Sequence, residues 1–392
     1  MKRFRIVRTA LLAFALTAGL SVFAPALSAL PFTTWIGTDG DWTNRSNWTV
    51  GVPSTITTGQ DIAQFNGQGS SAVTGATGAS SLEFDSGDYT INFVTVAKKG
   101  QASSTITVNA GTQTFNGVDM VSLSGVLPWT VAAGATLNVN NRVTSGFASG
   151  THSFNVNGTA HLFGAVTVAI TKSGTGTLTL DAASGATNSN VTVNAGTLLV
   201  NGVSSSGGVF AINSGGTLGG RGTIGTTTTI NSGATLAPGV SGPGVLTFGS
   251  ALTLASGSLT NFDINGTTRG TDYDGLNVGG QISYGDTLTL NFASSIQGGN
   301  TLDLLQLTGG VAPSTSFSSI LATGYYNGSF SDSGGIWSLS ASGQTFTFDQ
   351  STGDLTVTAT AVPEPATCAA LAGAAALGFV AYRRRRGGAA NV

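Results

Sequence analysis

The sequence of 392 residues contains little charge, one cysteine and only two histidines. Charged residues make up 8% of the chain, far below the ~25% found in ordinary soluble domains. Between residues 29 and 382, seven basic side chains stand against all 17 acidic ones, so this body has no basic patch for nucleic acid. The single Cys368 excludes a disulfide and a thiolate metal site in the body. Packing and hydrogen bonding must therefore stabilise the fold.

Residues that could carry catalysis are few and dispersed. His152 and His161 lie on two separate strand-like segments, which favours surface or corner positions over a catalytic triad or a zinc site. A polysaccharide lyase would need clustered acids beside a basic residue. The basic residues available within the body's repeats are Lys98, Lys99, Arg142, Lys172, Arg221 and Arg269. Because they are scattered, we expect no catalytic residues and no cofactor.

Two acidic pairs are candidates for a hard cation. Asp39 with Asp41, and Asp272 with Asp274, could each bind Ca²⁺ through carboxylate and backbone oxygens. Neither pair belongs to a full calcium-loop pattern. We therefore assign no metal site to the sequence.

Glycine is abundant, with 58 residues, and hydrophobic residues make up 40% of the chain. A motif recurs in which an apolar strand is followed by Asn or Ala, a small residue, Gly and Thr-Leu. It occurs as TITVNAGT, WTVAAGATL, NVTVNAGTLLV, FAINSGGTLGG, TTINSGATLAPG and LTLASGSL between residues 105 and 259. Its later turn glycines, Gly196, Gly215, Gly233 and Gly257, are 18 to 24 residues apart. That spacing is typical of one coil of a β-solenoid.

Period-two alternation supports this interpretation. Val191, Val193, Leu198 and Val200 would point to one face, and the corner glycine permits the positive φ of a sharp bend. One coil cannot bury its apolar face alone, but stacked coils share a core and pair their backbones, and aligned Asn and Thr can form ladders. A β-sandwich is the alternative, since short strands between turns also fit it. It stays open above all for residues 266–361.

The segment from Lys172 to Gly202, KSGTGTLTLDAASGATNSNVTVNAGTLLVNG, resembles the autotransporter-associated β-strand repeat. The downstream segments GGTLGGRGTIG and NSGATLAPGVSGPGVLTFGSALTL are also similar to the usual course of such proteins. The resemblance implies a right-handed parallel β-helix at the cell surface and no catalytic activity. The predicted fold is therefore all-β, with a β-helix body over residues 101–265.

Three of the five tryptophans, Trp35, Trp42 and Trp48, lie close together near the start of the body. Flat aromatic rings could contact a glycan by stacking. Alternatively, they form an end cap, because an open solenoid end would expose strand edges and apolar core. The segment resembles the opening that often precedes these repeats, and we assign residues 30–100 to a Trp-rich cap with the first strands.

The first 29 residues have the three parts of a signal peptide. MKRFRIVR is positively charged, TALLAFALTAGLSVF is apolar, and APALSA offers small residues for cleavage, with Ala26 and Ser28 as a fitting pair. This pattern predicts export through the Sec machinery. A retained N-terminal anchor is the alternative, although the apolar run is short for a membrane span.

The C-terminal segment has three parts: Val362-Pro363-Glu364-Pro365, an apolar run from Ala366 to Tyr382, and the arginines Arg383, Arg384, Arg385 and Arg386. As a helix, the 17-residue run would be about 25 Å long. It predicts a short transmembrane helix with a cytoplasmic basic cluster. The order and spacing of the parts are similar to the PEP-CTERM sorting signal. The resemblance implies that a membrane protease of the exosortase type recognises Glu364 and cuts near it. An unprocessed single-span anchor is the alternative.

The sequence thus predicts a signal peptide (1–29), a cap (30–100), solenoid repeats (101–265), a C-terminal β region (266–361), a sorting signal (362–386) and a tail (387–392). We expect a non-enzymatic structural or adhesive protein, exported to the cell envelope, the cell surface or the extracellular space, with transient insertion in the inner membrane. Its expected partners are the exosortase-type protease, the Sec machinery and, by resemblance alone, exopolysaccharide in a biofilm matrix. The alternative is a carbohydrate-binding or polysaccharide-degrading β-helix protein, since a fold does not determine function.

Overall fold

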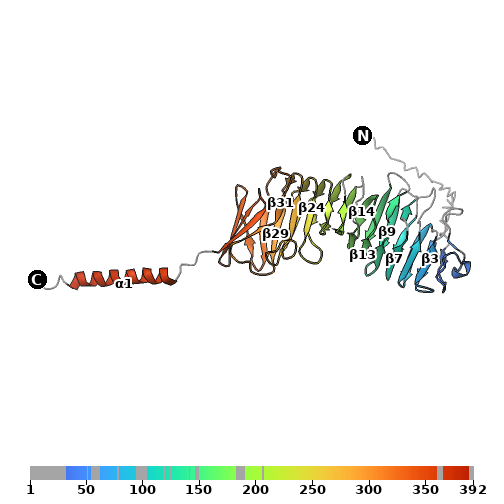
Figure 1. Ribbon diagram of the computed structural model, residues 1–392, viewed down its shortest axis with the longest axis horizontal. Helices are drawn as coiled ribbons and strands as arrows, with labels where there is room; N and C mark the ends of the chain where they lie inside the picture. Colours follow the sequence, from blue (N-terminus) through green and yellow to red (C-terminus); the bar gives the residue numbers. More distant parts are fainter. Residues whose placement is uncertain are drawn as a thin grey trace, which may run out of the picture.

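The computed structural model describes residues 32–50, 52–53, 62–76, 79–93, 104–117, 120–122, 126–140, 142–145, 150–181, 190–204, 207–359 and 365–387. The predicted signal peptide and residues 362–364 of the sorting motif lie outside this range. The body is an elongated stack of strands, and α1 (Pro365–Gly387), the one α-helix among the residues described, lies beyond its C-terminal end (Figure 1).

Two long parallel sheets run along the stack, and in each of them a strand pairs with the corresponding strand of the next coil. The first sheet consists, in spatial order, of β1 (Phe32–Thr34), β2 (Ile62–Asn66), β4 (Ser81–Ser86), β6 (Ile106–Val108), β9 (Val126–Val131), β12 (Thr151–Val156), β14 (Ala169–Ser173), β16 (Val191–Val193), β19 (Phe210–Ile212), β22 (Thr228–Ile230), β25 (Leu252–Leu254) and β28 (Ile282–Ser283).

The second sheet faces the first across the core. It consists of β3 (Ala72–Ala76), β5 (Tyr89–Phe93), β7 (Thr112–Asn116), β10 (Thr136–Val139), β13 (Thr159–Leu162), β15 (Thr177–Leu180), β17 (Gly196–Val200), β20 (Gly216–Gly219), β23 (Thr235–Leu236), β26 (Leu259–Ile264), β29 (Thr287–Phe292), β32 (Ser319–Gly324) and β33 (Gly328–Ser329). All its pairings are parallel except the last, between β32 and β33.

Smaller sheets complete the coils. A third parallel sheet contains β18 (Val203–Ser204), β21 (Thr223–Ile224), β24 (Val245–Phe248), β27 (Gly275–Val278) and β31 (Leu305–Leu307), while β8 (Met120–Ser122) pairs with β11 (Val143–Ser145). This pairing of each coil with the next fits the predicted β-solenoid. Hydrogen-bonded partners on neighbouring coils are 18 residues apart at Asn213 and Asn231, and 30 apart at Thr247 and Asn277.

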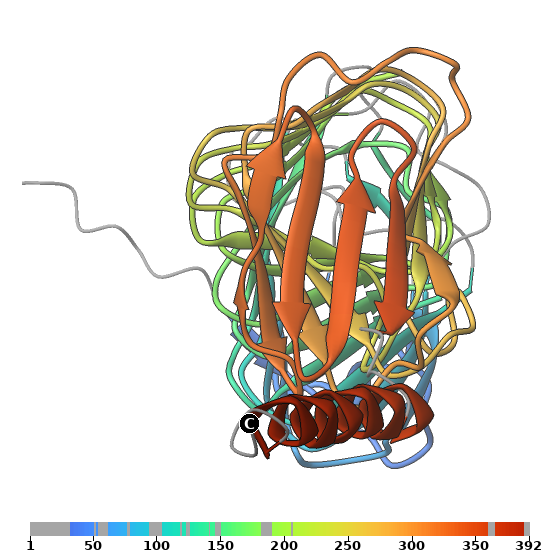
Figure 2. The same ribbon diagram turned by 90° about the vertical axis from the view of Figure 1, so that its left-hand side faces the viewer.

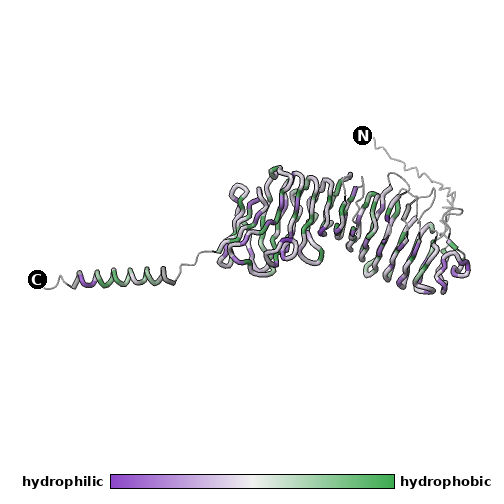
Figure 3. The backbone as a smooth tube through the Cα atoms, in the orientation of Figure 1, coloured by the Kyte–Doolittle hydropathy of each residue, from purple (hydrophilic) through white to green (hydrophobic). Residues whose placement is uncertain are grey.

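Alternating side chains build the core, as the period-two pattern predicts. Leu137, Leu178, Leu198, Leu218 and Leu236 occupy one inward column of the second sheet, and all are fully buried. The predicted asparagine ladder also forms at a corner: the Nδ2 of Asn213 donates to Oδ1 of Asn194 at 2.8 Å, and that of Asn231 donates to Oδ1 of Asn213 at 2.9 Å. Figure 3 shows hydrophobic and hydrophilic segments in the coils along the whole stack.

The turn glycines behave as predicted. Gly196, Gly215, Gly233 and Gly257 have φ values of 65°, 83°, 75° and 81°. A side chain at Gly233 would also meet the Ser214 hydroxyl of the preceding coil at 2.5 Å. Glycine is therefore required there both for the left-handed conformation and for the close approach of neighbouring coils.

The C-terminal β region differs from the sandwich-like alternative. The parallel coils continue through β32, and a separate antiparallel sheet follows, which we call the capping sheet: β30 (Asn300–Asp303), β37 (Asp354–Ala359), β36 (Gln344–Asp349), β35 (Ile336–Ala341) and β34 (Ser331–Ser333). Figure 2 shows this sheet lying across the end of the stack. Phe346 lies 5.2 Å from Phe292 and 4.6 Å from Tyr326, ring centre to ring centre. The capping sheet thus closes the core instead of forming a second domain.

Helix α1 begins at the proline of the sorting motif and includes the predicted apolar run and arginine cluster. Its predicted membrane-spanning role is not supported, because no helix in the part of the chain that the structure describes is long and apolar enough to cross a membrane. Ten of the 17 residues from Ala366 to Tyr382 are Ala or Gly, which contribute little apolar surface. The predictions of a transmembrane helix and of transient membrane insertion through it are corrected accordingly.

Two basic side chains lie inside the core, where the sequence predicted none. His152, expected at the surface or a corner, is buried, and its Nδ1 accepts a hydrogen bond of 3.0 Å from Nε1 of Trp129; burial lowers its pKa to about 4. Lys172 is fully buried between Phe154 and Val193, and its Nζ donates to four carbonyls, that of Val156 at 3.5 Å and three that lie closer. These three belong to Ser173, Gly174 and Ala195, at 2.9, 2.8 and 3.1 Å. Burial lowers the pKa of Lys172 to about 8.

A buried acid lies near the C-terminal end of the stack. Asp286 precedes Thr287 at the position where the preceding coils have Ser258 and Ala234. Its side chain is fully buried, and neither carboxylate oxygen makes a hydrogen bond of ordinary geometry within the described residues. Burial raises the pKa of Asp286 to about 6, although the nearby Thr260 hydroxyl offsets part of the rise. Compared with the unfolded chain, the folded state therefore favours the neutral form of this acid.

This arrangement predicts that the burial of Asp286 lowers the free energy of unfolding by an amount that depends on pH. Its folded pKa of about 6 lies above the ordinary 3.8, so the folded state binds more protons in that window and loses stability as the pH rises through it. Asp286→Asn should stabilise the protein relative to wild type more at about pH 7 than at about pH 4, by up to roughly 3 kcal/mol. Urea denaturation at the two pH values measures this difference.

The control is Asp332→Asn, because Asp332 is exposed and its acceptor role toward the Gly335 amide can be kept by an amide. Because this control changes an exposed side chain, it should alter the free energy of unfolding by only about 0.5 kcal/mol or less. An equal effect of Asp286→Asn at both pH values would contradict the raised pKa of this buried acid.

Candidate functional site

The predicted sorting segment is centred on α1. Pro365, the last residue of the Pro-Glu-Pro signature, is the first residue of the helix, a position that suits proline because its missing amide would have no partner there. Val362, Pro363 and Glu364 lie outside the described residues. Arg383 and Arg384 are exposed, and the guanidinium of Arg383 lies 5.7 Å from the centre of the Phe379 ring. Arg385 and Arg386 belong to the last turn.

The apolar side chains of α1 are exposed. Leu371, Leu377, Phe379 and Val380 all have more than half of their surface accessible, with Leu377 at 73%. Figure 3 shows the mainly apolar helix ending in hydrophilic residues, away from the stacked coils. The side chains described in this helix, residues 369–384, thus contribute nothing to the core of the body and are accessible from outside.

The three N-terminal tryptophans, the predicted glycan contacts, form a buried cluster. Trp35, Trp42 and Trp48 are at most 4% exposed. The rings of Trp35 and Trp48 meet edge to face with centres 5.0 Å apart, and those of Trp42 and Trp48 are 4.7 Å apart. Phe65 of β2 packs against all three. The cluster therefore covers the first coil, an arrangement that favours the end cap over the sugar-stacking platform.

A short 3-10 helix, η1 (Arg45–Asn47), folds this segment over the stack. Asn44 caps it by accepting a hydrogen bond from the Ser46 amide at 3.1 Å. Nε1 of Trp48 donates to the carbonyl of Trp42 at 2.9 Å, and Nε1 of Trp35 donates to that of Ser70 at 3.1 Å. Nε1 of Trp42 has no partner within the described residues. Hydrogen bonds thus fix the orientation of two of the three indole rings, in addition to the packing of the cluster.

The carboxylates of the first acidic pair accept hydrogen bonds from residues in nearby turns. Asp39 accepts hydrogen bonds from the Asp41 amide at 3.0 Å, from Asn44 at 2.8 Å and from Asn47, and these bonds, the first above all, lower its pKa. Asp41 accepts from the amide and the hydroxyl of Thr43 at 2.9 and 2.8 Å. Both carboxylates therefore have a structural role in the cap.

The second acidic pair holds a loop before β27. Asp272 accepts a hydrogen bond from the Thr268 amide at 3.0 Å, and hydrogen bonds from Thr268 lower its pKa. Asp274 is buried, and its carboxylate accepts from the amide of Gly244, just before β24, at 2.7 Å and from that of Asp263 in β26 at 2.8 Å. Burial raises the pKa of Asp274 to about 6. Among the described residues, no group of three or more His, Cys, Asp or Glu side chains is placed to hold a metal ion.

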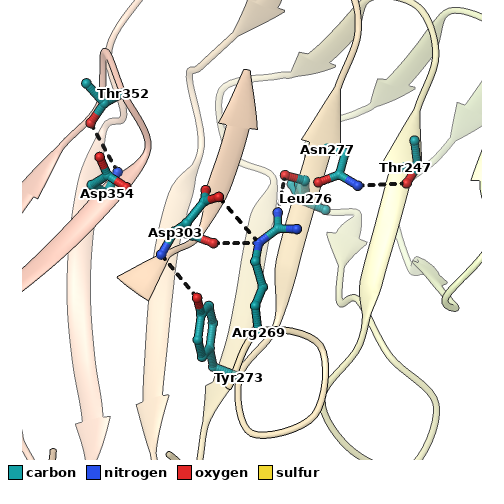
Figure 4. A network of polar contacts seen from close by, with 8 residues as sticks. All are labelled: Thr247, Arg269, Tyr273, Leu276, Asn277, Asp303, Thr352 and Asp354. Carbon is teal, nitrogen blue, oxygen red and sulfur yellow. Dashed lines mark hydrogen bonds and ion pairs between the residues drawn. The ribbon is translucent and has the colours of Figure 1, made fainter. Parts of the chain in front are cut away.

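Arg269, one of the scattered basic residues, lies in the same loop (Figure 4). Its Nε donates to the Asp303 carbonyl at 2.7 Å and lies 3.9 Å from the Asp303 carboxylate, while Nη2 donates to the Leu276 carbonyl at 2.9 Å. The Asp303 amide donates to the Tyr273 hydroxyl at 3.2 Å. The guanidinium thus connects the loop to β27 and β30, which gives it a structural role.

Comparison with known proteins identifies one segment. A family model described as the PEP-CTERM protein-sorting motif matches residues 361–386, the segment predicted from the Pro-Glu-Pro signature, the apolar run and the arginines. The match suggests an exported protein that is processed by an exosortase-type enzyme and directed to the cell envelope or surface. No curated protein matches the chain. The resemblance to autotransporter-associated repeats stays a prediction.

The tryptophan cluster allows a matched test of the cap. Trp42→Phe and Trp48→Phe remove the same atoms from a buried ring, but only Trp48→Phe removes a hydrogen bond within the cluster. We expect Trp48→Phe to lower the free energy of unfolding by about 1 kcal/mol more than Trp42→Phe does. Urea denaturation followed by tryptophan fluorescence measures the two values. A larger loss for Trp42→Phe would contradict the assigned hydrogen bond.

Proposed function

We propose that this chain is an exported structural protein of the cell surface or extracellular matrix. An exosortase-type protease cuts it near Glu364 and separates the solenoid body from α1. The match of residues 361–386 to the PEP-CTERM motif is the observation that carries this proposal. The exposed side chains of α1 support it, because the enzyme needs access to a segment that the body does not bury.

The body has features that suit a structural role. Its coils form a long stack (Figure 1), and we propose the right-handed sense that parallel crossover connections nearly always adopt. Both ends are covered, by the tryptophan cluster and by the capping sheet. Covered ends protect the strand edges from uncontrolled pairing with other chains. Such a body can act as a rigid spacer or adhesive element in a biofilm or exopolysaccharide matrix.

We propose a non-enzymatic role for the body. A lyase would need a basic residue positioned beside acids in an open cleft. Lys172 is buried, and the guanidinium groups of Arg221 and Arg269 donate to backbone carbonyls. Incubating the full chain with acidic polysaccharides should therefore release no new reducing ends, and turnover that a single Asp or Arg substitution abolishes would contradict this proposal.

The processing step can be tested by intact mass measurement of the exported protein. We expect the mature chain from normal cells to lack Arg383–Arg386, and the chain from cells without the exosortase-type protease to retain them. Glu364→Gln should reduce processing at least tenfold if the charge of Glu364 carries recognition, since a charged hydrogen bond contributes about 1.5–3 kcal/mol.

The matched control is Glu83→Gln, because Glu83 is the one other glutamate in the sequence and lies on β4 of the body. This variant should be processed normally. A mature chain that keeps the four arginines in normal cells would contradict the proposed processing.

A further inference from the structure

The outer face of the second sheet contains a hollow of about 480 Å³ that none of the features above explains. Its origin is the shortness of β23: the strands on either side continue to Gly219 and Ile264, whereas the chain leaves the sheet after Leu236. The departing loop, from Pro238 to Gly242, forms one wall. The floor is the outer face of β17 and β20.

The walls are held in place by hydrogen bonds. Nη2 of Arg221 donates to the Pro243 carbonyl at 3.0 Å and lies within 3.5 Å of the carbonyls of Val240 and Gly242. Gly220 and Gly239 exchange two backbone hydrogen bonds of 3.0 and 2.8 Å. Ser241, at the tip of the loop, has a φ of 54°, which is rare for a residue with a side chain. These hydrogen bonds hold the walls of the hollow in place without a ligand, which lowers the cost of ordering them on binding.

A ladder of threonines leads to the hollow along the outer face of the second sheet. Seven threonines stand in register on consecutive strands, namely Thr112, Thr136, Thr159, Thr177, Thr197, Thr217 and Thr235. Neighbouring strands are about 4.8 Å apart, so the ladder presents hydroxyl groups at a constant interval over about 29 Å. Thr197 and Thr217 are also part of the lining of the hollow.

The lining excludes several classes of ligand. It contains no lysine or arginine, and its one charged side chain is Asp263, so phosphate groups and acidic polymers are disfavoured. The floor is the face of a sheet whose backbone groups pair with neighbouring strands, which leaves no edge for an added peptide strand. What remains are the hydroxyls of Thr197, Thr217 and Ser241, the Asp263 carboxylate, and apolar patches from Leu199 and Val240.

This combination matches the chemistry of a sugar without charge. The hydroxyls of Thr197 and Thr217 can donate and accept, the Asp263 carboxylate accepts from ligand hydroxyls, and the apolar patches pack against C–H faces. We propose that the hollow binds a neutral saccharide chain whose successive units follow the threonine ladder along the stack. The inference rests on the proposed surface or matrix function and assigns its ligand contact to the second sheet instead of the tryptophan cluster.

The test uses the full chain and native gels containing a soluble neutral polymer, either a linear glucan, a mannan or a galactan, with polygalacturonate as the acidic comparison. At least one neutral polymer should retard the protein, and polygalacturonate should not. The double variant Thr197→Val and Thr217→Val keeps the β-branched shape but removes two hydroxyls, and it should weaken binding about tenfold. Asp263→Asn should also weaken binding.

The matched control is the double variant Thr192→Val and Thr229→Val, which changes half-buried threonines on the outer face of the first sheet. It should bind as the wild type does. No retardation by any of the three neutral polymers, stronger retardation by polygalacturonate, or an equal loss in both double variants would overturn the proposal. Processing at the sorting motif is measured by mass and would be unaffected by such a failure, so the two proposals fail separately.

Discussion

The parallel backbone pairing of each coil with the next is the constraint on which the rest of this structure depends. In-register pairs such as Thr197 with Thr217 and Asn194 with Asn213 bring equivalent residues of successive coils together. One favourable choice of residue is thereby repeated along the stack, giving the leucine column, the asparagine ladder and the row of threonines. The same alignment makes exceptions costly, since a polar group in an inward column must find partners within the core.

Lys172 and Asp286 are two such exceptions with different outcomes. The ammonium group of Lys172 donates to four carbonyls at a corner, whereas the Asp286 carboxylate has no hydrogen bond of ordinary geometry within the described residues. A stack of this kind also leaves two open ends. The tryptophans close the first coil, and the aromatic face of the capping sheet, with Phe346 and Phe348, closes the last.

The sequence predicted the features that repeat. The corner glycines, the alternating apolar residues and the asparagine ladder follow from local pattern, and Gly233 and Asn213 lie as expected. The sequence did not predict features that depend on the spatial surroundings of individual residues. His152 looked like a surface residue because strand alternation alone does not say which face is inward. The capping sheet has strands like those of a sandwich, and only its contacts across the end of the stack distinguish the two. The hollow arises from the shortness of β23, which no motif marks.

The shared core, the ladders and the two covered ends all require that the body is one continuous stack and not a row of small domains. Spin labels at Ser153→Cys and Thr253→Cys, in a Cys368→Ser background, test this most directly, because the two positions are joined by five successive strand pairings. Electron–electron resonance should give a narrow distribution with a backbone separation of about 24 Å. A broad distribution, or one centred far from that separation, would contradict the stacked architecture.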